Sequence, residues 1–134
     1  MSQENVEIVR RAVEAFNQRD LARLDELSSP DFEFAPYLAT LIETTTYRGR
    51  DGLRRYFEDA GAAWEDIQVR LSDDLRDLGE RIVFFGELCG RGRASGVEVQ
   101  VPLAWVTEIH EGKLTLLHSY ENPADALKAV GLAE

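Results

Sequence analysis

Cysteine and histidine are scarce in this sequence. Its 134 residues include one cysteine, Cys89, and two histidines, His110 and His118. A single cysteine excludes an internal disulfide, and so few thiol and imidazole groups give no spacing typical of a metal site. The chain also lacks a phosphate-binding or dinucleotide-binding motif. We therefore expect neither a metal nor a cofactor.

Basic residues are also few. The chain carries 15 Lys and Arg against 25 Asp and Glu, which gives a formal net charge of −10. Nucleic acids and anionic membranes need clustered positive charge, so neither is expected as a partner. The opening MSQENVEIVRR lacks the apolar core of a signal peptide, and no apolar run approaches the length of a membrane span. A cytoplasmic location is the resulting expectation.

Helical periodicity marks four segments of what we expect to be a single domain, residues 1–134. Apolar residues recur every three or four positions in residues 4–17, and a second short stripe follows Asp20, a good N-cap. A longer amphipathic helix is predicted to begin near Gly49, and a last short helix at Pro123.

Strand patterns account for most of the remaining chain. Short strands are predicted at 31–37 and 67–71, with 39–47 as a loop or a loosely paired strand. The acidic run 73–80 is interpreted as a solvated turn. Residues 81–122 then contain three runs rich in Val, Ile, Leu, Phe, Tyr and Trp, separated by turn signals at Ala94-Ser95-Gly96 and Glu111-Gly112.

This meander has one apolar face. In its middle run the odd-numbered residues from Val97 to Ile109 are mostly apolar, and a period of two places them on one side of a sheet. The helices can cover that side. The predicted fold class is therefore α+β, a roll in which a curved, mainly antiparallel sheet wraps around the N-terminal helices.

The chain resembles the nuclear transport factor 2-like superfamily, and within it the SnoaL-like polyketide cyclases and ketosteroid isomerases. The resemblance rests on the order of four pieces, VEIVRRAVEAFNQRDLARLDELSSPDFEF, TYRGRDGLRRYF, EGKL and SYENPADALKAVGLAE. It implies a cone-shaped fold with a deep pocket, and a homodimer. Because this superfamily includes isomerases, cyclases, hydrolases and non-catalytic binding domains, the fold alone does not fix the function.

The catalytic groups of the steroid isomerases are missing from the matching positions. Ala35 stands where those enzymes have a carboxylate base, and Ala12 where they have a tyrosine. Trp105, or Ala104 if the alignment shifts, replaces their protonated aspartic acid. An enolisation of that type needs both a base and an oxyanion donor, so this chain cannot perform it with residues at those positions.

Three other residues are candidate acids or bases. Glu87 alternates with Phe85 and Cys89 and points inward if that face is internal. It is then either a functional acid or the partner of a strand cation. The competing orientation has Ile82, Phe84 and Leu88 inward. Glu43 lies in the loop that commonly rims such pockets, and His118 is a strand-borne imidazole able to titrate near neutrality; both can equally be surface residues.

The register of the last hairpin decides which polar groups face the pocket. A two-residue turn at Glu111-Gly112 pairs Trp105 with His118 and places His118 and Tyr120 inward. A three-residue loop with a bulge instead places Ser119 and Glu121 inward. The apolarity of the strand favours the first register, and the family resemblance favours the second.

Five aromatic residues are candidate ligand contacts, because aromatic faces often line apolar sites. They are Phe34, Tyr37, Phe57, Trp64 and Trp105. Two functions remain open. One is a cofactor-free isomerase, cyclase or hydrolase acting on a small apolar metabolite, and the other is a non-catalytic binding or sequestering domain.

Overall fold

A computed structural model describes residues 2–36 and 46–132 of the chain. Its helices are α1 (Ser2–Asn17), α2 (Leu21–Leu27), α4 (Gly49–Ala63) and α5 (Pro123–Ala129). As predicted, Asp20 caps α2, with its carboxylate accepting a hydrogen bond of 3.1 Å from the backbone N–H of Arg23. Within the described ranges, no helix has both the length and the apolarity needed to cross a membrane.

Six strands form one sheet in the order β2-β1-β6-β5-β4-β3. The strands are β1 (Ser28–Ala35), β2 (Tyr47–Arg48), β3 (Trp64–Asp77), β4 (Arg81–Gly92), β5 (Glu98–His110) and β6 (Lys113–Tyr120). Neighbouring strands run antiparallel except for β1 and β6, which run parallel. The sheet is therefore mixed and mainly antiparallel, and the α+β class predicted from the sequence is confirmed.

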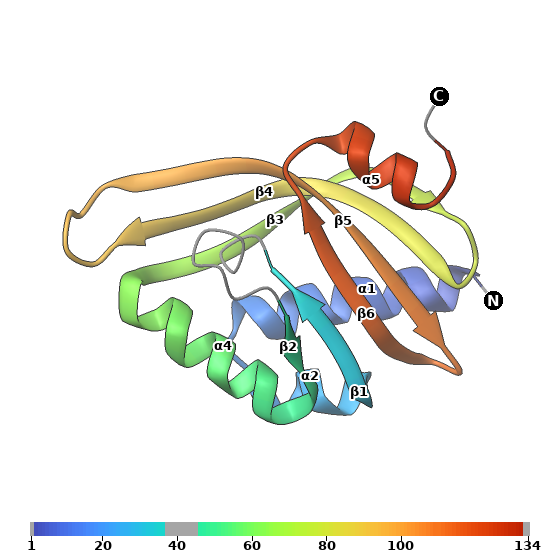
Figure 1. The fold of residues 1–134 in the computed structure, drawn as a ribbon, viewed down its shortest axis with the longest axis horizontal. Coiled ribbons are helices and arrows are strands. Elements are labelled where there is room, and N and C mark those ends of the chain that lie inside the picture. Colours follow the sequence, from blue (N-terminus) through green and yellow to red (C-terminus); the bar gives the residue numbers. More distant parts are fainter. Residues whose placement is uncertain (1, 37–45, 133–134) are drawn as a thin grey trace.

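Three of the described helices cover one face of the sheet, and one helix covers the other face. The sheet curves around α1, α2 and α4 (Figure 1), whose apolar residues join the main core with the inward side chains of the strands. Helix α5 packs on the opposite face, where Ala126 and the C-cap residue Val130 form a smaller buried cluster with Val83, Ala104 and Val106. The expectation that helices lie on one side thus holds for three of the described helices and not for α5.

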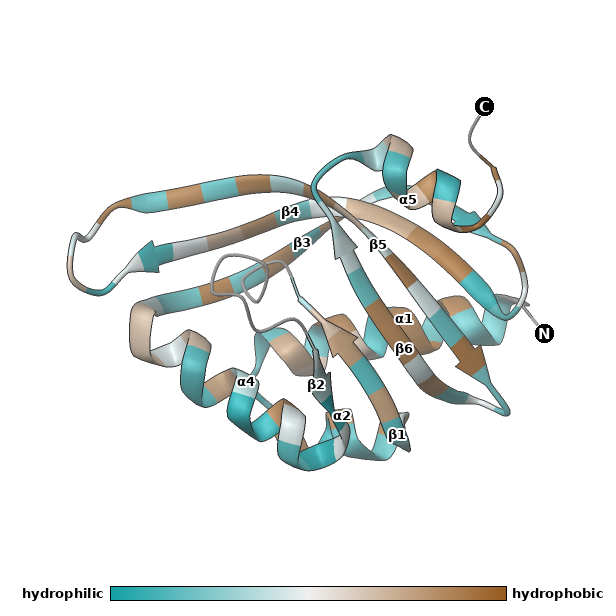
Figure 2. Cartoon of the chain, viewed as in Figure 1, coloured by the Kyte–Doolittle hydropathy of each residue, from teal (hydrophilic) through white to brown (hydrophobic). Residues whose placement is uncertain are grey.

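The predicted alternation along β5 is confirmed in its second half. Leu103, Trp105, Thr107 and Ile109 point inward and are buried. Brown and teal segments alternate along the part of β5 next to the hairpin turn (Figure 2), as expected for a strand with one apolar face. Near the start of the strand, Val97 is 58% exposed, because there the hairpin extends beyond the helices (Figure 1).

The prediction of a turn across the acidic run 73–80 is wrong. Strand β3 continues to Asp77, with an irregularity in its pairing between Leu71 and Leu75, and the chain turns only at 78–80. Asp73 and Asp74 are exposed within this edge strand, where charged side chains discourage pairing with another chain.

The last hairpin combines features of both predicted registers. Glu111 and Gly112 form a two-residue turn with φ of 51° and 77°, so that His110 pairs with Lys113. A bulge before Leu116 then shifts the pairing by one residue, which sets Trp105 opposite Ser119. The turn is therefore that of the first register, while the inward Ser119 is that of the second.

Candidate functional site

The inner face of the sheet and the helices α1, α2 and α4 enclose a cavity of about 70 Å³, here called the cone cavity. Its walls come from most elements of the fold, for example Val13 on α1, Leu53 on α4, Leu88 on β4 and Leu117 on β6. Apart from four hydroxyl-bearing residues, every described lining residue is apolar. Such a lining suits an apolar molecule with few polar groups.

Two of the four hydroxyls are bound within the protein. Ser28 Oγ donates a hydrogen bond of 2.7 Å to the carbonyl of Leu24, and Thr107 Oγ1 donates one of 2.8 Å to the carbonyl of Leu116. The other two belong to Tyr56 and Ser119. Among the described residues neither has a hydrogen-bond partner, so these two hydroxyls are the ones able to bind a polar group of a ligand.

Among the described lining residues, Tyr56 is the one with an acid–base side chain. Its side chain, on α4, is buried against Phe34 with ring centroids 4.9 Å apart. Burial raises the pKa of the Tyr56 phenol far above its ordinary value; the nearby charge of Arg19 lowers this pKa and Tyr47 raises it. The phenol therefore remains protonated at neutral pH and acts as a hydrogen-bond donor rather than as a base.

The structure places two of the five predicted ligand contacts in this cavity. Phe34 and Trp105 both line it and are 5% exposed. Trp105 stacks on Phe84, with ring centroids 5.2 Å apart. Their position in the cavity wall agrees with the predicted inward faces of β1 and β5.

Phe57 and Trp64 line a different space. They border a hollow of about 300 Å³ between the ends of α1 and α4 and the start of β3, here called the α1–β3 hollow. Phe16 and Tyr56 line both spaces and so form the wall between them. The single aromatic site predicted from the sequence is thus divided between two cavities.

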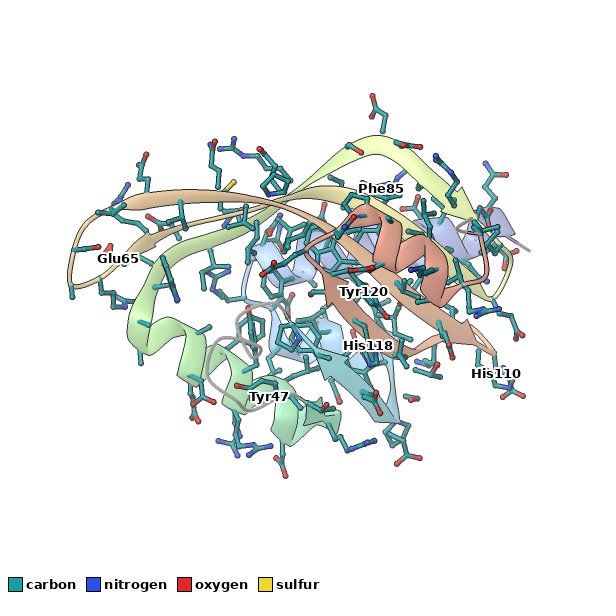
Figure 3. The ribbon with its side chains drawn as sticks, turned by 45° about the horizontal axis from the view of Figure 1, so that its top comes forward. Tyr47, Glu65, Phe85, His110, His118 and Tyr120 are labelled. Atoms are coloured by element: carbon teal, nitrogen blue, oxygen red, sulfur yellow. The ribbon has the colours of Figure 1, made fainter. Side chains whose placement is uncertain are left out.

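Glu87 does not point into the cone cavity. The inward residues of β4 are Ile82, Phe84 and Leu88, as in the competing orientation, while Val83 and Phe85 pack towards α5 on the outer face. Figure 3 shows Phe85 beside α5. Glu87 shares this outer face, half-buried and opposite Arg70 of β3. Of the two orientations that the sequence leaves open for Glu87, the structure has the outward one.

His118 also lies on the outer face, on β6 (Figure 3). Its Nε2 atom lies 2.7 Å from Oε2 of Glu33 on β1, and Oε1 of Glu33 lies 3.0 Å from a guanidinium nitrogen of Arg48. His118 is opposite Val106 in the sheet, so its imidazole is separated from the cone cavity by the sheet itself. The remaining candidates, Tyr37 and Glu43, lie outside the described residues.

Two of the three positions matched to catalytic groups of the steroid isomerases line the cavity. These are Ala12 and Trp105, which offer a methyl group and an indole, whereas Ala35 is not among the described lining residues. No group of three or more His, Cys, Asp or Glu side chains able to hold a metal ion occurs in residues 2–36 and 46–132.

Glu33 and Ser119 were not among the predicted site residues. Glu33 alternates with Phe32 and Phe34, a pattern that places it on the outer face, but its contact with His118 depends on a parallel pairing that no local pattern reveals. Ser119 was weighed only as one outcome of the hairpin register. The bulge in β6 that turns it inward has no clear signal in the sequence.

Solved structures of similar fold are numerous. An NTF2-like protein of unknown function from Burkholderia pseudomallei K96243 is 20% identical, with a TM-score of 0.78 over 96% of this chain and 98% of that one. A protein of ketosteroid-isomerase-like fold from Catenulispora acidiphila DSM 44928, in complex with trimethylamine, is 18% identical, with a TM-score of 0.74 over 94% and 93%. TerC, co-crystallised with polyporic acid, is 16% identical, with a TM-score of 0.78 over 93% and 96%.

Because all three identities are low, these likenesses show only that the fold is shared. A search of curated proteins found no significant match to the chain. The sequence itself matches the SnoaL-like domain family over residues 9–117. Since this match spans most of the chain, the protein belongs to the SnoaL-like domain family.

Proposed function

We propose that the protein binds a small apolar molecule in the cone cavity. The observation that carries the proposal is the lining of this cavity, in which apolar side chains from helices and sheet surround two available hydroxyls, those of Tyr56 and Ser119. Burial of an apolar surface drives such binding, and a few placed polar groups orient the ligand.

The volume of the cavity limits the size of the ligand. At about 70 Å³ it is smaller than the engineered cavity of about 150 Å³ that takes up benzene. A single ring therefore requires small shifts of the lining side chains or protrudes from the cavity, and two fused rings do not fit within it. We expect ligands of about one ring, with a carbonyl or hydroxyl group directed at Ser119 or Tyr56.

The second candidate function is catalysis of the kind that cyclases and isomerases perform in related families. The Tyr56 phenol, kept protonated by burial, favours it, because a protonated phenol in a cavity wall can polarise a ligand carbonyl. Such a reaction also needs a base. The described lining residues include no carboxylate, imidazole or amine, so we favour binding over catalysis.

The proposal is tested by NMR titration of the isotope-labelled protein with toluene and with cyclohexanone, two probes of one ring. Both probes should shift the amide signals of cavity residues such as Leu103 and Leu117. Ser119→Ala should weaken cyclohexanone binding about five-fold, the worth of one hydrogen bond, and leave toluene binding unchanged. Shifts confined to surface residues, or none near the solubility limit, would refute the proposal.

A further inference from the structure

We propose that the α1–β3 hollow is a second binding site, which takes a planar aromatic molecule carrying a carboxylate. The hollow measures about 300 Å³, against about 70 Å³ for the cone cavity. It is formed where the end of α1, the end of α4 and the first residues of β3 meet. This inference is independent of what occupies the cone cavity.

Aromatic side chains form part of the lining of the hollow. Phe16, Phe57 and the half-buried Trp64 line it, and the rings of Phe16 and Phe57 are tilted, with centroids 5.6 Å apart. Tyr56 packs edge-on against Phe57, also at 5.6 Å. A flat aromatic molecule can pack on such a surface by offset stacking or edge contacts, and so gain from both area burial and ring geometry.

The rim of the hollow supplies a positive charge. The guanidinium of Arg19 lies 5.9 Å from the ring centroids of Phe16 and Phe57. One of its nitrogens donates hydrogen bonds to the carbonyl oxygens of Phe16 and Ile67, at 3.2 and 2.8 Å. These neutral partners hold the guanidinium at the rim without cancelling its charge.

The other charged residues of the described lining, Asp66 and Arg93, each pair with a residue outside the hollow. Asp66 lies 3.8 Å from Arg91, and Arg93 lies 3.7 Å from Glu65. Within the described residues no carboxylate lies within 4.0 Å of Arg19. The chain has a net charge of −10, yet the guanidinium of Arg19 has no carboxylate beside it among the described residues. Arg binds carboxylates through charge-assisted hydrogen bonds. A guanidinium in this position, next to aromatic rings, therefore points to an anionic ligand.

The backbone at the rim is consistent with a fixed site. Arg19 and Asp66 both adopt left-handed conformations, with φ of 58° and 55°. The left-handed conformation is unfavourable for residues other than glycine, and residues held in it are concentrated at ligand sites. The left-handed turn at Arg19 joins α1 to α2 and allows its side chain to reach the carbonyl of Ile67 on β3.

The experiment compares 2-naphthoate with 2-naphthamide, which has the same two rings without the charge. Two rings exceed the cone cavity, so the size of the probe also separates the two sites. We expect naphthoate to shift the amide signals of Gly61, Trp64 and Gln68, to bind at least about ten-fold more tightly than naphthamide, and to weaken as salt is added.

Arg19→Gln should reduce naphthoate affinity about ten-fold and leave naphthamide affinity unchanged. Arg54→Gln is the matched control, because it removes the same charge from an exposed position on α4 where Arg54 pairs with Asp51 and Glu58. Arg19→Gln also removes the hydrogen bond from Arg19 to Ile67 on β3, which can affect folding. Gly61→Leu therefore provides a second variant. Gly61 lines the hollow, and a Cβ atom there meets no atom within 4 Å. A leucine therefore has room to begin at this position, and we expect it to narrow the hollow and lower naphthoate binding.

Equal affinities for naphthoate and naphthamide would overturn the proposal, as would unchanged naphthoate binding in folded Arg19→Gln. Shifts centred on Leu117 in the cone cavity, or no binding of naphthoate at any soluble concentration, would overturn it as well. If Arg19→Gln does not fold, the salt dependence of the wild type and the effect of Gly61→Leu decide the question.

Discussion

The imidazole of His118 lies 2.7 Å from the carboxylate of Glu33, and this contact joins β6 to β1 across their parallel pairing. Both side chains are mostly shielded from solvent, with exposed fractions of 29% and 26%. Through its other oxygen Glu33 also contacts Arg48 of β2 at 3.0 Å. The two outermost strands on this side are thus linked to the meander by side chains as well as by the backbone.

A double-mutant cycle on Glu33→Ala and His118→Ala should therefore give a coupling energy of about 1 kcal/mol in the free energy of unfolding. The chain contains a matched control in His110 and Glu80, a pair at 3.0 Å whose side chains are 66% and 71% exposed. Its coupling should be close to zero, because solvent screens exposed pairs. Equal coupling in both cycles, measured by denaturant unfolding, would contradict a structural role for the Glu33–His118 contact.

Trp105→Ala should lower the free energy of unfolding by about 3–5 kcal/mol, because it removes a large buried side chain that stacks on Phe84. Val97→Ala, just before the same strand, should change it by less than about 0.5 kcal/mol, since Val97 is 58% exposed. A loss below about 1 kcal/mol for Trp105→Ala would mean that this face of β5 does not form the core.

Stability should fall in alkaline solution. Burial raises the pKa of Tyr56, and burial together with the hydrogen bond to Asp59 raises the pKa of Tyr47. The folded state therefore holds these protons more tightly than the unfolded state does. The resulting stability is complete below about pH 10, the ordinary tyrosine value, and is lost as the pH rises above it.

The measurement is urea unfolding of the wild type and Tyr56→Phe at several pH values on either side of about pH 10. The phenylalanine variant should show a shallower decline, because it lacks one of the two phenols that ionise on unfolding. A decline of the same slope in both proteins would show that Tyr56 does not contribute.

We expect the protein to form a homodimer through the outer face of its sheet, as the family resemblance implies. That face carries half-buried side chains beside α5, including Phe85 and Tyr120 (Figure 3). Sedimentation at micromolar concentration should give about twice the chain mass of 15.1 kDa. A single species of 15.1 kDa would show that the chain is a monomer under these conditions.

Local periodicity explains why most elements could be predicted. The stripe in α1, the cap at Asp20 and the turn at Glu111-Gly112 each depend on residues a few positions apart, and all three occur as expected. The parallel pairing of β1 with β6 joins residues as distant as Glu33 and Leu116. No pattern within either strand specifies that partner.

The orientation of β4 could not be decided from the sequence, for a related reason. Ile82, Val83, Phe84 and Phe85 form a continuous apolar run, so the period of two identifies two faces without showing which is internal. The packing of α5 on the outer face accounts for this run, since Val83 is buried beneath that helix. Because the sequence does not show which face this last helix covers, it leaves the orientation of Glu87 open.

Binding in the cone cavity is tested most directly by two neighbouring leucines on β6. Leu117 lines the cavity, whereas Leu116 has the opposite orientation on the same strand. Leu117→Phe adds volume inside the cavity, and Leu116→Phe adds the same volume outside it. Both variants are compared with the wild type by NMR titration with toluene, after unfolding curves have shown that they are folded.

We expect Leu117→Phe to weaken toluene binding at least about ten-fold, a change of about 1.4 kcal/mol, and Leu116→Phe to bind toluene as the wild type does. Glu87→Gln, on the outer face, should also bind as the wild type. Equal toluene affinity in the two leucine variants, or a loss of binding in Glu87→Gln, would contradict an apolar ligand site inside the cone.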